Sequence, residues 1–94
     1  MRVLIFDKSF RRALKRCCKN RPKLQAKVLE TLSQLEIDPF SPILKAHKLQ
    51  GELQGLWSCS VEYDFRIVFY FQKLEDEEEE AIVLVDVDTH DEVY

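Results

Sequence analysis

Two clusters of polar residues in the second half of the chain carry the side chains best suited to acid–base chemistry. The first, HKLQGELQGLWSCSVEYDFR, runs from His47 to Arg66 and includes Asp64. The second, THDEVY, ends at Tyr94 and includes His90. Two histidines are enough for one acid and one base, because imidazole titrates near neutral pH. A base that takes a 2′-hydroxyl proton, an acid that protonates the leaving oxygen and an arginine on the phosphate would together cleave a phosphodiester bond.

The spacing of the polar residues suggests how they would meet. In an extended chain Asp86, Asp88 and His90 point the same way, and Arg66 on a neighbouring strand can face the same side. A simpler interpretation also fits, because the polar face of any sheet that is covered on one side displays such residues. Aspartate is common in turns, so a residue in Asp64's position is more often simply a turn residue.

Several kinds of site are missing from the sequence. It contains no glycine-rich phosphate loop, no dinucleotide fingerprint and no cysteine or histidine cluster with metal-ligand spacing. We therefore expect neither a metal nor a cofactor. The three cysteines, Cys17, Cys18 and Cys59, fit reduced thiols, and Cys59 is expected in the core.

The elements that must position these residues follow from hydrophobic spacing. An apolar run at 2–6 predicts a strand, and apolar residues three and four apart predict two helices, the second opening at Pro22. Prolines at 39 and 42 end the second helix, and a loop with the only two glycines follows. Strands are predicted at 56–62, 65–71 and 81–87, with the acidic run EDEEEE joining the last two.

We therefore predict a single α+β domain over residues 1–94, with the order β-α-α-β-β-β. A helical hairpin should pack on one face of a mainly antiparallel four-stranded sheet. In the last strand, strict alternation predicts two faces. Val83, Val85 and Val87 are expected on one face of the sheet, and Ile82, Leu84 and Asp86 on the other. The other face of the sheet would be left to water or a ligand.

Charge is distributed unevenly along the chain. The net charge is −3, yet residues 1–30 hold ten Lys and Arg against two Asp and Glu. A positive patch on an acidic protein can attract a polyanion locally, although a solvated helix face is the equally simple explanation. No apolar run approaches the ~20 residues that cross a bilayer, so no membrane association and a cytoplasmic location are expected.

The order of elements and both motifs resemble the RelE/ParE superfamily of bacterial toxins from type II toxin-antitoxin systems. The resemblance covers nearly the whole chain. It is carried by the HKLQGELQGLWS loop and strand, the DFRIVFYF strand and the THDEVY ending, the last of which is similar to the YafQ-type branch.

That resemblance implies a ribosome-dependent mRNA endoribonuclease that works without metal. It also implies a cognate antitoxin protein, in a toxin–antitoxin hetero-oligomer. By position, the resemblance assigns catalysis to His47, Asp64, Arg66, His90 and Tyr94. RNA contacts are expected from Lys45, Lys48 and Phe65, with Phe65 or Tyr94 stacking on a base. An acidic, apolar antitoxin segment is expected to dock on Arg11, Arg12, Lys15 and Arg16.

The sequence departs from the YafQ-type pattern at three positions. Ser60 stands in place of a histidine, Asp86 in place of an arginine and Asp88 in place of a glycine. Losing an arginine and gaining two carboxylates weakens attraction for phosphates. Two alternatives to the nuclease therefore remain: a ParE-like inhibitor of DNA gyrase, against which the polar tail argues, and an inactive member that binds antitoxin as a corepressor.

Overall fold

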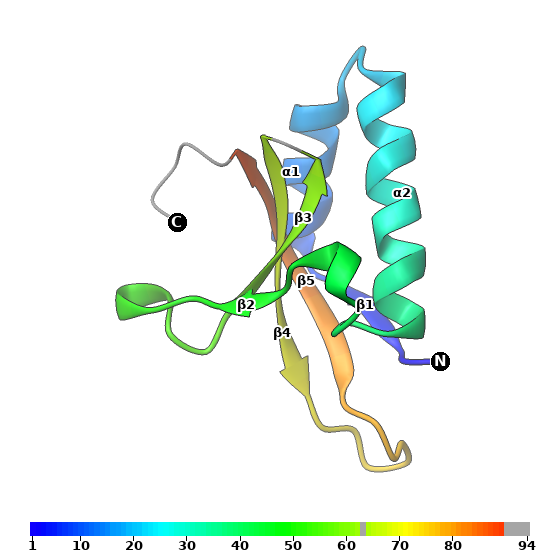
Figure 1. Cartoon of the computed structure of the whole chain (residues 1–94), viewed down its shortest axis with the longest axis vertical. Coiled ribbons are helices and arrows are strands. Elements are labelled where there is room, and N and C mark those ends of the chain that lie inside the picture. Colours follow the sequence, from blue (N-terminus) through cyan, green and yellow to red (C-terminus); the bar gives the residue numbers. More distant parts are fainter. Residues whose placement is uncertain (63, 90–94) are drawn as a thin grey trace.

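The structure, a computed structural model, describes residues 1–62 and 64–89. For Thr89 it describes the backbone but not the side chain. Its two helices lie on one side of a single sheet (Figure 1). The helices are α1 (Lys8–Cys18) and α2 (Pro22–Ile37), and two short 3₁₀ turns cover Pro42–Leu44 and Gly51–Leu53. The strands are β1 (Leu4–Phe6), β2 (His47–Lys48), β3 (Trp57–Glu62), β4 (Phe65–Gln72) and β5 (Ala81–Thr89).

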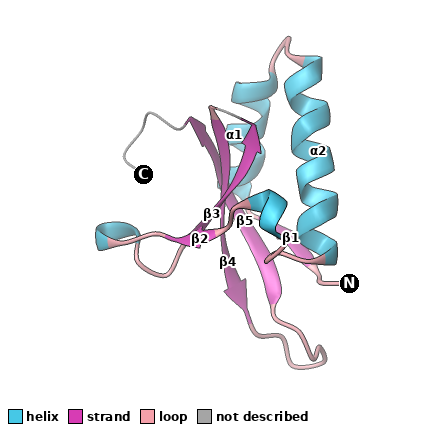
Figure 2. Cartoon of the chain, in the orientation of Figure 1, coloured by secondary structure: helices cyan, strands magenta, loops and turns pink. Residues whose placement is uncertain are grey.

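The described strands form one five-stranded sheet in the order β1-β5-β4-β3-β2. β1 runs parallel to β5 and the other neighbours are antiparallel. Figure 2 colours these strands apart from the helices and loops. The α+β class and the order of the main elements are as predicted, but the strand number is not. His47 and Lys48 pair with Ser58 and Trp57 and so add a short edge strand within the predicted loop. Two residues are too few for a period-2 pattern to reveal.

Local signals explain the helical hairpin. Asp7 caps α1 by accepting a hydrogen bond from the Lys8 backbone N–H at 2.7 Å. Asn20 takes a left-handed conformation (φ 58°) in the turn between the helices, which asparagine tolerates better than most residues. Pro22 then opens α2 in the first turn, where its missing N–H costs nothing.

The main core lies between the helices and the sheet. Phe10, Val28 and Leu35 of the helices and Ile67 and Phe69 of β4 are fully buried there. Cys59 of β3 also belongs to this cluster, as predicted. Burial of large apolar side chains of this kind is the dominant stabilising contribution, at roughly 1.5–3 kcal/mol each.

A β-bulge in β5 overturns the predicted alternation in that strand. Leu84 pairs with Phe69 and Asp86 with Val68, so Val85 is an extra residue between them. Beyond the bulge Val87 pairs with Ile67 and enters the core beside Leu84, instead of sharing a face with Val83. The bulge lets the strand keep both Leu84 and Val87 in the core and both acidic residues out of it.

Candidate functional site on the outer face of the sheet

The sheet face turned away from the helices, called the outer face below, carries two of the five predicted catalytic residues, His47 and Arg66. Register places Arg66 of β4 between Ser60 of β3 and Asp88 of β5. The next row holds Val68 of β4 between Ser58 and Asp86, with His47 of β2 beyond Ser58. The alternation of side chains thus gathers an imidazole, a guanidinium and two carboxylates on one face.

The outer face has an apolar, buried floor, contrary to the prediction that the whole face would be left to water or a ligand. Val68 and Val83 are almost fully buried on it. Leu49, which follows β2, is also buried. Ser58 is fully buried, and within the described residues its Oγ finds no hydrogen-bond partner. The polar groups therefore surround a small buried area rather than standing on a fully exposed surface.

His47 is exposed at the sheet edge. Its Nδ1 lies 3.2 Å from the carbonyl oxygen of Lys45, a residue held in a left-handed conformation at φ 51°. If Nδ1 carries the proton and donates to that carbonyl, Nε2 is left as an acceptor. β2 and β4 are two strand spacings apart, about 10 Å, so His47 and Arg66 would act on a group that sits between them.

The two carboxylates make the β5 side of the site electronegative. Burial raises the pKa of Asp86, and the neighbouring charge of Asp88 raises it further. The backbone N–H of Val87, which donates to Asp86 Oδ1 at 2.8 Å, and the charge of Arg16 oppose this rise. Arg16 belongs to α1, which packs along β5 beyond the end of β1. A helix residue thereby supplies positive charge close to the position where the YafQ-type pattern has an arginine.

Cys17 lies at the same junction of α1 and β5. Its Sγ donates to the carbonyl oxygen of Val87 at 3.6 Å. Burial raises the pKa of this thiol, while Arg16 favours the thiolate. Cys59 is more strongly affected, because complete burial raises the pKa of its thiol to about 12. At neutral pH it is therefore an inert thiol in the core.

Asp64 lies in the turn between β3 and β4 at one end of the sheet, and Phe65 is the first residue of β4. Asp64 is exposed there, and Phe65 pairs with Thr89, so the end of β5 lies beside this turn. Phe65 is only 8% exposed and belongs to the core, with the Arg21 guanidinium 5.2 Å from its ring centre. Contrary to the expected RNA contact, a ring covered in this way is not available for stacking on a base. His90 and Tyr94 lie outside the described residues.

The remaining predicted contacts fall elsewhere. Lys48 points away from His47, because neighbouring residues in a strand face opposite sides, and its Nζ lies 5.7 Å from the centre of the Trp57 ring. The four predicted antitoxin contacts on α1 are all exposed. They lie on two sides of that helix: Arg11 and Lys15 border a groove beside α2, whereas Arg16 approaches Asp86.

Sequence reasoning missed two features of this site. Arg16 was assigned to antitoxin docking alone, and no local pattern shows that it approaches Asp86. Ser58 was not singled out at all, because a serine in a strand carries no signal of its own. In the described part of the chain no group of three or more His, Cys, Asp or Glu side chains is placed to hold a metal ion.

A helical hairpin on a mostly antiparallel sheet, with polar side chains around a buried floor on the outer face, is also the fold of solved toxin structures. The family described as "Bacterial toxin of type II toxin-antitoxin system, YafQ" matches residues 2–94. The chain belongs to this family.

Known relatives agree with this assignment. The chain is 36% identical over 47 residues to Toxin RelK of Mycobacterium tuberculosis, covering 50% of this chain and 55% of that protein. It thus spans about half the length of this curated relative. The YoeB/ParE toxin from Agrobacterium tumefaciens has the same fold, with a TM-score of 0.75 at 17% identity over 94% of this chain and 98% of the other. The toxin-antitoxin complex RelBE2 from M. tuberculosis contains a chain with a TM-score of 0.69 at 25% identity. The match covers 94% of this chain and 96% of that one.

Among the described residues, no helix is long and apolar enough to cross a membrane.

Proposed function

We propose that this protein is an endoribonuclease that cleaves mRNA on the ribosome and thereby inhibits translation. The observation that carries the proposal is the arrangement of the outer face, where Arg66 and His47 flank a buried floor at Val68. Membership of the YafQ toxin family supports it.

The proposed mechanism divides the reaction among a few side chains. Arg66 holds the scissile phosphate and stabilises the charge that builds up on it, as a planar guanidinium does well. His47 and His90 exchange protons with the 2′-hydroxyl and the leaving oxygen, and Asp64 and Tyr94 assist them as orienting group and base-stacking ring. Each acid or base contributes typically 10²–10⁴-fold in rate.

The test is expression of the chain without antitoxin, with mapping of mRNA ends in the same cells. We expect growth arrest and new ends within translated frames, both abolished by Arg66→Ala and by His90→Ala. The matched control is Arg12→Ala, an exposed arginine on α1. Cleavage that persists in both site variants would disprove these roles, and arrest with intact mRNA would point to a gyrase-directed activity instead.

One observation favours a second function. Asp88 lies directly opposite Arg66, and Asp86 lies one row away, so two carboxylates oppose the approach of a phosphate. The alternative is an inactive member that keeps only the ability to bind antitoxin. Folded protein that causes no arrest would support it, and Asp86→Arg would then be expected to restore cleavage.

We also propose an antitoxin that docks on the groove between α1 and α2. The groove has a volume of about 510 Å³, and Leu14 and Cys18 line it together with three cationic side chains, Arg11, Lys15 and Lys19. An apolar floor between cations fits an acidic amphipathic segment. One structurally similar chain comes from the toxin-antitoxin complex RelBE2 of M. tuberculosis.

Charge reversal tests this docking surface. Arg11→Glu with Lys15→Glu should weaken antitoxin binding by at least about tenfold and flatten its dependence on salt, because two charge contacts are lost. Lys23→Glu with Lys27→Glu, on exposed positions of α2, is the matched control. Unchanged affinity and salt dependence in the first pair would exclude the groove.

A further inference from the structure

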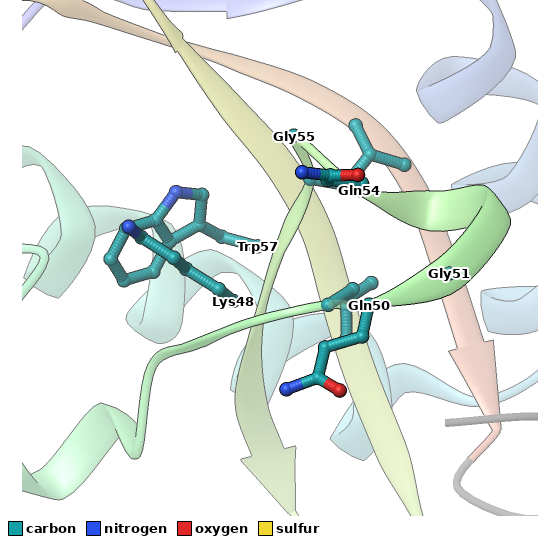
Figure 3. A pocket seen from close by; sticks show the side chains of 8 residues that line it. Lys48, Gln50, Gly51, Gln54, Gly55 and Trp57 are labelled. Atoms are coloured by element: carbon teal, nitrogen blue, oxygen red, sulfur yellow. The ribbon is translucent and has the colours of Figure 1, made fainter.

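Positive charge is scarce on the strands that form the outer face. Lys48 and Arg66 are the only Lys or Arg residues within the described strands. Lys48 does not serve this face, because its side chain extends across the indole of Trp57, which packs against the core on the helix side of the sheet (Figure 3). Arg66 is thus the one described strand cation on the outer face, and Asp86 and Asp88 place two carboxylates beside it. A cation from another element would offset them when a phosphate binds.

Helix α1 lies along an edge of the sheet from which such a cation can come. Strand β1 ends opposite Leu84, so beyond this residue the edge of β5 has no strand beside it in the described part of the chain. Ser9 Oγ donates to the carbonyl oxygen of Val85 at 2.7 Å, and Cys17 Sγ donates to that of Val87 at 3.6 Å. Strand carbonyls point sideways within the sheet, so α1 flanks this edge and its side chains can pass around it to the outer face.

Arg16 belongs to the side of α1 that follows this edge. It lies seven residues after Ser9, which is two helical turns, so the two side chains leave the helix on the same side. Because the neighbouring Cys17 contacts Val87, Arg16 is level with the aspartates on either side of Val87. Arg16 is exposed, and no ion pair between it and a described carboxylate is found.

The Asp86 carboxylate leans over the same edge. The N–H and the carbonyl of Val87 point to one side of the strand, as in any antiparallel ladder, and Cys17 contacts that side. The Val87 N–H donates to Asp86 Oδ1 at 2.8 Å, which draws the carboxylate toward α1. Burial raises the pKa of Asp86 and that of Cys17, and the charge of Arg16 opposes both increases. Hydrogen bonds and charge thus both bring Arg16 to the β5 side of the outer face.

We propose that Arg16 is a second phosphate-binding residue of the site, held at the β5 edge by Asp86. The scissile phosphate lies between the guanidinium groups of Arg16 and Arg66. When the 2′-oxygen attacks phosphorus and the bond to the leaving oxygen breaks, negative charge builds up on the nonbridging oxygens, and Arg16 stabilises it from the side opposite His47. The proton transfers stay with the histidines. The proposal rests on the proposed function and adds a catalytic residue to it.

Moving the arginine to another element tests this role. Arg16→Ala should slow mRNA cleavage about 100-fold, because one charged donor to the transition state is lost. Adding Asp86→Arg to this variant should restore most of the lost rate, since the new guanidinium starts from the outer face itself. Arg16→Lys keeps the charge but not the planar pair of donors, so it should retain RNA binding better than cleavage. Lys27→Ala removes an exposed cation of α2 and, as the control, should cleave like the wild type.

RNA binding separates a phosphate contact from a structural role. The probe is a fluorescein-labelled single-stranded RNA whose 2′-hydroxyls are methylated, so that it cannot be cleaved. Arg16→Ala should weaken its binding about tenfold at low salt and reduce the slope of log affinity against log salt by about 0.7, the value for one phosphate contact on a single strand. A purely structural Arg16 would instead lower the melting temperature of the protein and leave this slope unchanged.

The outcomes separate this inference from the nuclease proposal. Cleavage at the wild-type rate in Arg16→Ala would overturn the role of Arg16 and leave the nuclease standing. Lost cleavage with an unchanged salt slope and no rescue by Asp86→Arg would also overturn it, since Arg16 would then only stabilise the fold. If the wild type cleaves no mRNA, the proposed function fails. In that case a lower salt slope in Arg16→Ala would still support phosphate binding by Arg16, and an unchanged slope would overturn it.

Discussion

Ser58 is the residue whose local environment most clearly conflicts with its chemistry. Its hydroxyl is fully buried on the outer face beside His47 and, within the described residues, lacks a hydrogen-bond partner. A buried polar group in this state costs roughly 1–3 kcal/mol. The hydroxyl of Thr31, by contrast, is buried but donates to the carbonyl oxygen of Lys27 at 2.8 Å. The two residues therefore predict opposite responses to loss of the hydroxyl.

We expect Ser58→Ala to raise the free energy of unfolding by about 1 kcal/mol, because the unsatisfied hydroxyl is removed. Thr31→Ala should lower it by about 1–2 kcal/mol, since a satisfied hydrogen bond and a methyl group are lost. Urea denaturation measures both. Ser33→Ala, at an exposed position on α2, serves as the control and should change stability by less than about 0.5 kcal/mol. A Ser58→Ala protein less stable than the wild type would indicate that the hydroxyl has a partner.

The raised pKa of Asp86 predicts that the stability of the protein depends on pH. Its pKa is raised from 3.8, first by burial and then by Asp88, so the folded protein binds its proton more tightly than the unfolded chain does. The resulting stabilisation is present below about pH 3.8 and is lost as pH rises through the folded-state pKa.

Asp86→Asn should therefore be more stable than the wild type at pH 7, with the difference shrinking as the pH approaches 3. Asparagine keeps an oxygen that accepts from the Val87 N–H, so that hydrogen bond is retained. Thermal melts between pH 3 and 8 measure the effect, and Asp76→Asn in the acidic connection controls for removal of one negative charge. A pH-independent difference would contradict the assignment to Asp86.

At the scale of elements, the bulge in β5 decides which side chains face the site. It places Asp86 and Asp88 on the outer face while Leu84 and Val87 remain in the core. The bulged residue also contributes a contact to α1, since Ser9 Oγ donates to the carbonyl oxygen of Val85 at 2.7 Å. Bulges commonly lie beside functional sites, where they redirect side chains.

Deletion of Val85 tests this role. The shortened strand can pair regularly and still keep Leu84 and Val87 inward and both aspartates outward, so we expect a folded protein. Its free energy of unfolding should fall by about 1–3 kcal/mol, because the Ser9 hydrogen bond and local packing are disturbed. Val85→Ala keeps the bulge and should lower the free energy of unfolding by only about 1 kcal/mol. Complete unfolding of the deletion variant would show that the extra residue itself is required.

On the scale of the whole molecule, opposite charges gather at opposite ends. The acidic connection between β4 and β5 lies at one end of the longest dimension, 39 Å, and the turn between the two helices lies at the other (Figure 1). The helices carry the exposed cations Arg11, Lys15 and Lys23. Such a charge distribution orients an approaching polyanion over distances comparable to the Debye length, about 10 Å at 0.1 M salt.

Neutralising part of the acidic end should speed association with RNA. Glu77→Gln with Glu78→Gln leaves the hydrogen bonds from Lys73 Nζ intact, because it donates to their backbone carbonyls, and spares Glu79, which lies 3.7 Å from Arg2. We expect the association rate at low salt to increase about twofold to fivefold, measured on an immobilised single-stranded RNA. The increase should vanish at about 0.5 M salt, and a gain that survives there would contradict an electrostatic origin.

The sequence alone determined the helices and the three long strands, because these depend on local hydrophobic period and on capping residues. It also placed His47 and Arg66 in a family pattern, and the register sets both on the outer face. The catalytic roles assigned to them and to Asp64, His90 and Tyr94 remain predictions.

Only the tertiary structure decided the features that depend on long-range pairing. The bulge at Val85 arises from matching β5 to β4, and the edge strand at His47 exists only because Ser58 lies beside it. The burial of Phe65 under Arg21 and the proximity of Arg16 to Asp86 join segments far apart in the sequence. Local spacing fixes which residues can share a face, but partner strands and packed helices fix which of those residues meet.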